Sequence, residues 1–255
     1  MNLRDRAISR KGVYILPNLL TTASLFAAFL GLTWAARGSF EACALAILVS
    51  ALFDGLDGKV ARLTGASSEF GIQLDSLADM VAFGVTPAFM TYFWMLENFG
   101  RLGLLACFLF VACGALRLAR FNLQTKVVSK KFFIGLPIPA AGCTLATLVL
   151  FAPYLPVSFQ QSVLPVFILV LAYVLSFLMV STVRYASFKE LGLVKAHPFS
   201  AMVTAILLFV LVASQPKLLG FLILLGYLIS GMAYTLFVLS RRSARMLRES
   251  SKDIS

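Results

Sequence analysis

Apolar runs about as long as a bilayer is thick follow one another along almost the whole chain. They constrain its fold more than any other feature, because a helix needs about 20 apolar residues to cross the hydrocarbon core and must satisfy its backbone internally. We expect eight such spans, at residues 16–36, 40–63, 71–96, 102–123, 139–155, 162–183, 199–214 and 218–240. The sequence therefore predicts an all-α polytopic membrane protein, a bundle of about eight transmembrane helices.

Composition supports a membrane protein over a soluble one. Only 13% of the 255 residues are charged, about half the usual fraction in soluble domains. The four cysteines fall within apolar runs without metal-ligand pairing, which indicates small core residues. A net charge of +11 could indicate nucleic acid, but the cations lie in short segments between apolar runs. We expect contact with anionic membrane lipids and no nucleic acid.

The distribution of cations predicts the orientation. Of the 22 Lys and Arg residues, all but Arg37, Arg101 and Lys217 fall on the side of the expected bundle that holds both termini. By the positive-inside rule, this side is cytoplasmic. We expect an amphipathic interfacial arm at 1–16, a transmembrane catalytic domain at 17–240 and a basic cytoplasmic tail at 241–255. The predicted location is the inner (cytoplasmic) membrane.

Four aspartates interrupt the apolar runs. Asp54 and Asp57 are three residues apart, and Asp75 and Asp79 are four apart, so each pair shares one face of a helix. A short turn at 64–68 would bring the two helices antiparallel and the two pairs together. Four carboxylates so close repel one another in a low dielectric. Mg²⁺ or Mn²⁺, which take oxygen ligands, would remove this conflict, and ionised residues inside a membrane are usually functional.

Small residues run beside the first aspartate pair. Gly55, Gly58, Ala61 and Gly65 recur at helical spacing near Arg62, whose guanidinium suits a phosphate. Such a stripe could simply let two membrane helices pack closely. Beside carboxylates and an arginine, a flat groove for a nucleotide or pyrophosphate is the better interpretation.

Residues 54–79 match the pattern D-x-x-D-G-x-x-A-R-x8-G-x3-D-x3-D at every constrained position. In this motif the chain resembles the CDP-alcohol phosphatidyltransferases. The resemblance implies that Asp54, Asp57 and Asp75 bind two divalent ions, and that Asp79 is the general base and shares in metal binding. The residues that it implies for contact with the CDP-lipid are Gly58, Arg62 and Ser68, together with Asn18, Leu19, Leu20 and Thr21 of a Pro-Asn-x-x-Thr segment.

Three further segments look like those of the bacterial integral-membrane phosphatidylserine synthases: Leu-Arg-Leu-Ala-Arg-Phe-Asn at 116, Gly-Leu-Pro-Ile-Pro-Ala at 135 and Met-Val-Ser-Thr-Val-Arg-Tyr at 179. This likeness implies transfer of a phosphatidyl group from CDP-diacylglycerol to the hydroxyl of L-serine, with release of CMP. Arg117, Arg120 and Arg184 are candidates to hold the carboxylate of serine. Alternatively, such arginines extend to the lipid headgroups.

Other functions also fit some of these features. Within the family, the acceptor could be glycerol 3-phosphate or inositol phosphate. An intramembrane prenyltransferase also uses aspartates, Mg²⁺ and pyrophosphate, but its motifs usually lie in distant halves of the chain. A cation transporter would place acids in membrane helices without needing Arg62 or the glycine stripe. We also expect a homodimer.

Overall fold

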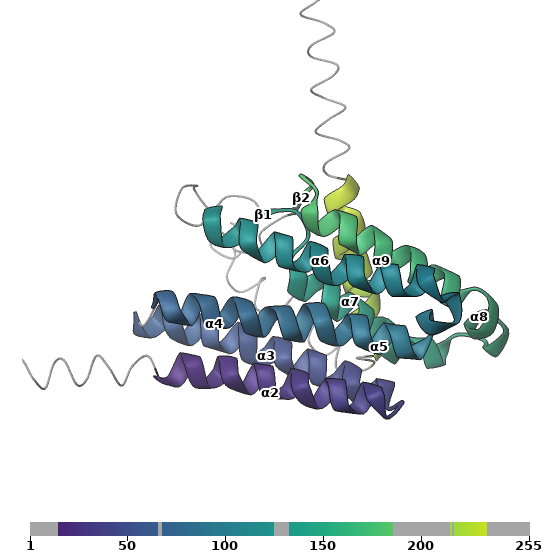
Figure 1. Ribbon diagram of the computed structural model, residues 1–255, viewed down its shortest axis with the longest axis horizontal. Coiled ribbons are helices and arrows are strands. Elements are labelled where there is room, and N and C mark those ends of the chain that lie inside the picture. Colours follow the sequence, from purple (N-terminus) through teal and green to yellow (C-terminus); the bar gives the residue numbers. More distant parts are fainter. Residues whose placement is uncertain (1–14, 66–67, 125–132, 186–214, 216, 234–255) are drawn as a thin grey trace, which may run out of the picture.

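The computed structural model describes residues 15–65, 68–124, 133–185, 215 and 217–233, and in them the chain is almost wholly helical (Figure 1). The all-α membrane fold is thus confirmed. The long helices are α2 (Ile15–Ala36), α3 (Phe40–Thr64), α6 (Arg101–Gln124), α7 (Ile138–Phe151), α9 (Leu164–Val180) and Lys217–Ala233, the last helix among the described residues. One further helix is built from α4 (Glu69–Asp79), the π-helical segment η1 (Met80–Val85) and α5 (Thr86–Trp94).

Short elements complete the described chain. The 3₁₀ turns η2 (Leu96–Phe99) and η3 (Ala152–Tyr154) and the short helix α8 (Val157–Ser162) connect the long helices. The strands β1 (Phe133–Ile134) and β2 (Arg184–Tyr185) form an antiparallel pair in which Phe133 faces Tyr185.

Most expected spans correspond to described helices. The span expected at 162–183 is shorter, because 157–162 forms a separate helix and α9 starts at Leu164 after it. Within the described residues, the helices long and apolar enough to cross a membrane by themselves are Ile15–Ala36 and Arg101–Leu123. The expected span at 199–214, most of the arm at 1–16 and the tail at 241–255 lie outside the described residues.

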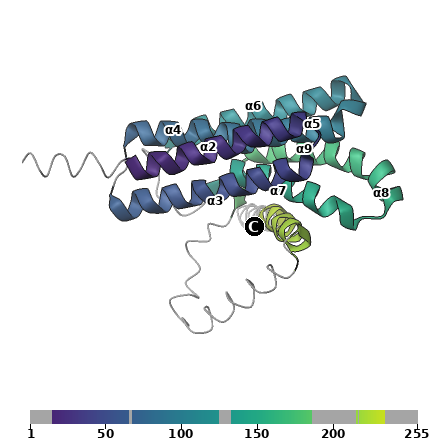
Figure 2. The same cartoon turned by 90° about the horizontal axis from the view of Figure 1, so that it is seen from below.

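The helices form two packed groups (Figures 1 and 2). In the first, α2 packs along α3, and the α4–α5 helix lies against both. In the second, α6 packs against α9, and α7 joins the groups through its contacts with α3 and η1. Chain direction places the α3–α4 turn at one end of the bundle and the α2–α3 turn at the other.

Small and hydroxyl side chains fill the seam between α2 and α3. Ala28, Cys43 and Ala44 are fully buried there. The hydroxyls of Ser24 and Ser50 lie 2.6 Å apart, and each also reaches the other residue's carbonyl. Close approach and interhelical hydrogen bonds stabilise helix pairs in lipid, where burial of apolar side chains adds little.

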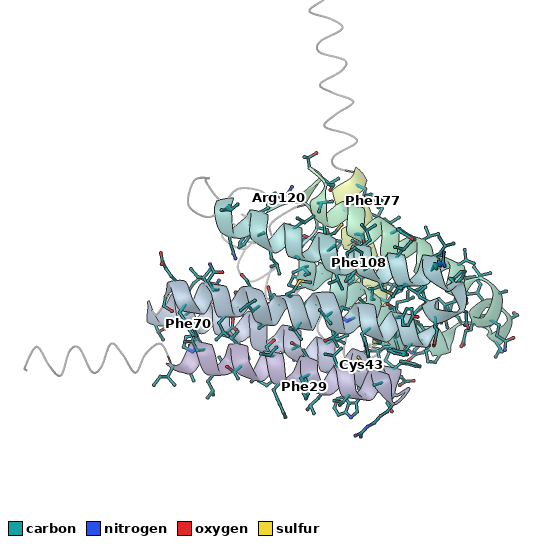
Figure 3. All side chains as sticks on the ribbon, viewed as in Figure 1. Phe29, Cys43, Phe70, Phe108, Arg120 and Phe177 are labelled. Atoms are coloured by element: carbon teal, nitrogen blue, oxygen red, sulfur yellow. The ribbon has the colours of Figure 1, made fainter. Side chains whose placement is uncertain are left out.

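Large apolar side chains point away from the bundle (Figure 3). Phe29, Phe108 and Phe177 are 58%, 66% and 62% exposed. Side chains of this size left uncovered on several helices would be unfavourable in water. They fit a surface that faces lipid tails.

The α3–α4 turn brings the two aspartate pairs together. Gly65 ends α3 in the left-handed conformation (φ 64°), and its N–H donates to the carbonyl of Ala61. Ser68 then caps α4, because its hydroxyl accepts a hydrogen bond of 3.0 Å from the N–H of Gly71. Glycine tolerates a positive φ and serine is a preferred N-cap, so these two residues favour a tight antiparallel hairpin.

Candidate metal and substrate site

Four carboxylates meet near the α3–α4 turn. Asp54, Asp57 and Asp75 each offer an oxygen atom, and these three atoms lie within 4.8 Å of one another. Asp79 is one turn below Asp75 on α4, and its carboxylate is within hydrogen-bonding reach of that of Asp54. The antiparallel pairing expected from the spacing is therefore present in the structure.

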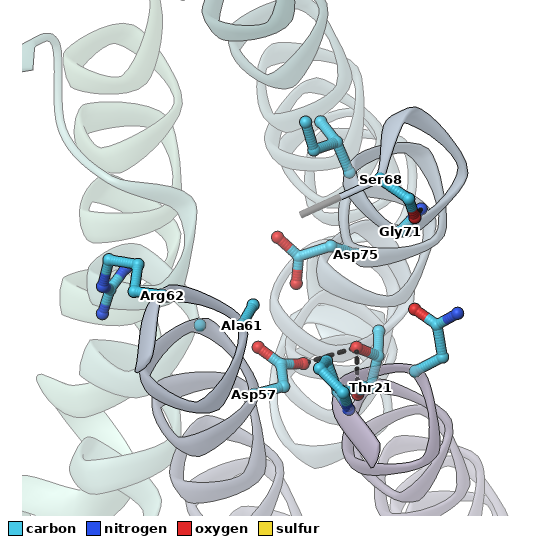
Figure 4. A pocket seen from close by; sticks show the side chains of 11 residues that line it. Thr21, Asp57, Ala61, Arg62, Ser68, Gly71 and Asp75 are labelled. Carbon is cyan, nitrogen blue, oxygen red and sulfur yellow. Dashed lines mark hydrogen bonds between the residues drawn. The ribbon is translucent and has the colours of Figure 1, made fainter. Parts of the chain in front are cut away.

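Helix α2 contributes a hydroxyl to this cluster. Thr21 donates a hydrogen bond of 2.6 Å to Oδ2 of Asp57, and the same hydroxyl lies 3.1 Å from the carbonyl of Pro17 (Figure 4). Asp57 is only 4% exposed. A hydrogen bond to a buried carboxylate restricts its rotation, as partners of metal-binding carboxylates commonly do.

The donor set fits a hard divalent cation. All four side chains offer carboxylate oxygens, the ligands that Mg²⁺ and Mn²⁺ prefer. Without a cation, the mutual repulsion of these four carboxylates, one buried and three partly buried, would oppose this packing. Asp54, Asp57 and Asp75 could hold an ion together, and Asp79 is close enough to share in it.

A cavity of about 180 Å³ opens beside the carboxylates (Figure 4). It is bounded by α2, the end of α3 and the start of α4, and its lining residues are Pro17, Asn18, Thr21, Asp57, Gly58, Ala61, Arg62, Ser68, Gly71, Ile72 and Asp75. Five of the seven residues expected to contact the CDP-lipid are among them. Leu19 and Leu20 are not in this lining, and Leu19 is 61% exposed.

Glycines bring backbone close to the polar groups of the cavity. A Cβ on Gly71 would lie 3.1 Å from Oγ of Ser68 and 3.2 Å from Oδ1 of Asn18, tighter than an ordinary contact. A Cβ on Gly58 would lie 3.5 Å from Nη1 of Arg62, which is an ordinary contact. The role of Gly71 was not predicted, although its place in the aspartate motif could have indicated it.

Arg62 lies at the edge of this cavity. Its side chain is exposed, and in Figure 4 its guanidinium is directed away from Asp57 and Asp75. It remains within electrostatic range of Asp57. The guanidinium therefore lies at the edge of the cavity and not against the carboxylates.

The three candidate acceptor arginines occupy different environments. Arg117 is 7% exposed and lies within electrostatic range of Asp79 and of Tyr227 on the last helix. Arg120 donates hydrogen bonds of 3.2 and 3.4 Å to the carbonyls at the end of α9. The backbone of Arg184 lies in β2 opposite Ile134, and its side chain is outside the described part.

Comparison with known proteins bears on this site. The family model described as CDP-alcohol phosphatidyltransferase matches residues 14–178. A CDP-diacylglycerol–serine O-phosphatidyltransferase of Helicobacter pylori strain J99 is 42% identical over 181 residues, which are 70% of this chain and 74% of that protein. One of Methanocaldococcus jannaschii is 42% identical over 144 residues, 56% of this chain and 62% of that protein. An archaetidylserine synthase of Methanothermobacter thermautotrophicus is 36% identical over 179 residues, 69% and 72% of the two chains.

Proposed function

The chain belongs to the CDP-alcohol phosphatidyltransferase family, and from this premise we propose that it is a CDP-diacylglycerol–serine O-phosphatidyltransferase. It transfers the phosphatidyl group of CDP-diacylglycerol to the hydroxyl of L-serine and releases CMP. The names of its relatives support serine as the acceptor.

The observation that carries the proposal is the position of the carboxylate cluster at one wall of the cavity. Asp57 and Asp75 belong both to the cluster and to the lining. A pyrophosphate in this cavity would therefore lie against any cations that the aspartates hold. We propose that Asp54, Asp57 and Asp75 bind two Mg²⁺ or Mn²⁺ ions, with Asp79 sharing in their binding. The chemistry such ions supply is neutralisation of the pyrophosphate and of the leaving CMP.

The remaining lining residues orient the donor. The amide of Asn18 and the hydroxyl of Ser68 flank Gly71 and offer hydrogen bonds to the cytidine diphosphate. Arg62 offers a bidentate contact to a phosphate. Thr21 keeps the Asp57 carboxylate in one orientation.

Asp79 acts on the acceptor in this proposal. The serine oxygen attacks the phosphorus that carries the diacylglycerol, opposite the bond to CMP. The new phosphorus–oxygen bond forms as the bond to the CMP phosphate breaks, and the serine hydroxyl proton passes to the carboxylate of Asp79. Proton removal by a positioned carboxylate is general base catalysis, which contributes about 10²–10⁴-fold.

An arginine near Asp79 would hold the carboxylate of serine. Arg117 is the best placed of the three candidates, because it is buried and within electrostatic range of Asp79. Arg120 already bonds to the carbonyls at the end of α9. Arg184 remains a candidate from the sequence alone.

We further propose an orientation and an assembly. The aspartate site faces the cytoplasm from the inner membrane, which the distribution of Lys and Arg supports. Anionic lipids contact the basic segments, and two chains form a homodimer. Cross-linking of the protein in its native membrane tests the dimer.

The test of the function is an acceptor panel. Purified protein is incubated with CDP-diacylglycerol and Mn²⁺ or Mg²⁺, and with labelled L-serine, glycerol 3-phosphate or inositol phosphate. We expect labelled phosphatidylserine and an equal amount of CMP with serine alone. Preference for a phosphorylated acceptor would disprove the serine assignment while leaving phosphatidyl transfer intact. Stabilisation by CMP without transfer to any acceptor would disprove both.

A further inference from the structure

The helix that carries Asp75 and Asp79 changes its winding directly after Asp79. Residues Met80–Val85 form a π-helical segment between α4 and α5. A π-helical turn contains one residue more than an α-helical turn, and such segments are frequent at functional sites. The extra residue turns the helix before it by about 100° relative to the helix after it.

Two residues explain why the α-helix is interrupted here. Pro87 has no N–H, so it cannot donate to the carbonyl of Phe83, four residues before it. Gly142 of α7 lies directly against that carbonyl, since a Cβ on Gly142 would be only 2.7 Å from the Phe83 oxygen. The N–H of Thr86 instead donates to the carbonyl of Val81, five residues back.

The side chain of Thr86 adds a second bond to the same segment. Its hydroxyl lies 2.8 Å from the carbonyl of Val81 and 3.4 Å from that of Ala28 on α2. Thr86 is fully buried. Its methyl carbon would be 3.1 Å from a Cβ placed on Gly31, so Thr86 also fits closely against α2.

The change in winding lets the two parts of this helix face different environments. Before the π segment, Asp75 and Asp79 face the aspartates of α3. Within and after it, Phe83 and Met90 are fully buried in the apolar core. Meanwhile α2, which Thr86 contacts, holds Thr21 against Asp57.

We propose that Thr86 is a positioning residue for the transfer reaction. Its hydroxyl bonds to the carbonyl of Val81 within the π segment and reaches that of Ala28 on α2, which fixes the segment against α2. The fixed segment in turn directs the Asp79 carboxylate toward Asp54 and the acceptor. This inference rests on the proposed function, because it assigns Thr86 an effect through Asp79.

The experiment compares three variants of the full-length enzyme in detergent micelles containing CDP-diacylglycerol. Thr86→Val keeps the shape of the side chain and removes its hydroxyl, whereas Thr86→Ser restores the hydroxyl without the methyl group. Thr91→Val is the matched control, because Thr91 is also buried on α5 and its hydroxyl donates to the carbonyls of Pro87 and Ala88 in its own helix. For each variant, kcat, the KM of both substrates and Tm are measured.

We expect Thr86→Val to lower kcat by about ten- to a hundredfold, as a small misplacement of a reacting group does. The KM for CDP-diacylglycerol should change by less than about threefold, since the loss falls on the chemical step. Thr86→Ser should recover most of kcat, and Thr91→Val should keep it.

Three results would overturn the proposal. One is an unchanged kcat in Thr86→Val, and another is an equal loss in Thr91→Val. The third is a Tm of Thr86→Val far below that of Thr91→Val, or no folded Thr86→Val protein, which would assign the hydroxyl to stability. If the proposed function itself is wrong, the wild-type enzyme makes no phosphatidylserine. If only the role of Thr86 is wrong, the wild-type enzyme is active and Thr86→Val gives one of the three results above.

Discussion

The carboxylates of Asp54, Asp57 and Asp75 lie close enough to share a cation. Asp54→Asn, Asp57→Asn and Asp75→Asn should each lower kcat by about 10²–10³-fold, a loss typical of removing one preorganised electrostatic group. Each should also raise the Mn²⁺ concentration needed for half-maximal activity, because a charged ligand becomes a neutral one of equal size. Transfer to serine at a series of Mn²⁺ concentrations measures both effects.

Glu69→Gln is the control for this series. Glu69 is an exposed acid in the first turn of α4 and is not part of the cavity lining. It should keep wild-type activity. Full activity in EDTA, or in any two of the asparagine variants, would contradict the two-ion hypothesis.

Removing the hydroxyl of Thr21 tests whether the orientation of the Asp57 carboxylate affects metal binding. Thr21→Val removes the 2.6 Å bond to Asp57 and should lower metal affinity or activity by about ten- to a hundredfold, as for partners of metal ligands in general. Titration of activity with Mn²⁺ measures it. Thr22→Val is the control, because the exposed Thr22 bonds to a backbone carbonyl of its own helix. Equal effects in both variants would assign the loss to α2 rather than to Asp57.

Asp79 is predicted to differ in role from the other three aspartates. Asp79→Asn should lower kcat by about 10²–10⁴-fold, the contribution of a general base, while CDP-diacylglycerol still binds. Binding is read from the stabilisation of the variant by CDP-diacylglycerol in a thermal shift assay. If the variant no longer binds the nucleotide lipid, Asp79 is a fourth metal ligand rather than a base.

At the scale of elements, α6 carries within one turn an arginine proposed for the acceptor site, Arg117, and an arginine that bonds to α9, Arg120. Arg117→Ala should raise the serine KM by about ten- to a hundredfold, since a charge-assisted contact to a carboxylate contributes roughly 1.5–3 kcal/mol. Arg120→Ala should instead lower Tm, because two carbonyls at the end of α9 lose their donor. Kinetics for both substrates and thermal unfolding separate these effects.

Arg184→Ala completes this comparison as the third candidate. A rise in serine KM confined to Arg184→Ala would assign the contact with the serine carboxylate to Arg184 in β2. If all three variants change only the KM for CDP-diacylglycerol, these arginines serve the phosphates of the donor.

At the scale of the whole molecule, the bundle has two chemically distinct ends. The aspartates and Arg62 lie at one end, whereas Arg37 lies in the α2–α3 turn, and Lys217 forms a 2.9 Å ion pair with Glu41 at the start of α3. Arg37 and Lys217, two of the three cations assigned to the non-cytoplasmic side, are therefore at the end opposite the site.

Cysteine labelling tests this orientation in cells. The four native thiols are buried, so an impermeant maleimide should report on an introduced cysteine. Arg37→Cys should be labelled in intact spheroplasts, and Thr64→Cys, next to the site, only after permeabilisation. The reverse pattern would contradict the charge argument and would place the site outside the cytoplasm.

Much of this protein could be predicted from its sequence. Apolar runs of membrane length determine helices because lipid leaves no other partner for the backbone. The three- and four-residue spacings of Asp54, Asp57, Asp75 and Asp79 determine shared helix faces, and Gly65 with Ser68 determines a tight turn between them. These features are local, so residue spacing was sufficient to predict the shared faces and a short turn at 64–68, and the structure shows that Gly65 and Ser68 form its caps.

Other features depend on contacts between segments far apart in the sequence. The bond from Thr21 to Asp57 requires the packing of α2 on α3, and the difference between Arg117 and Arg120 requires the position of α9. The π segment arises where the Phe83 carbonyl, which receives no N–H from Pro87, lies against Gly142 on another helix. Only the tertiary structure decided these features, because a side chain's partners are set by how the helices pack and not by their periodicity.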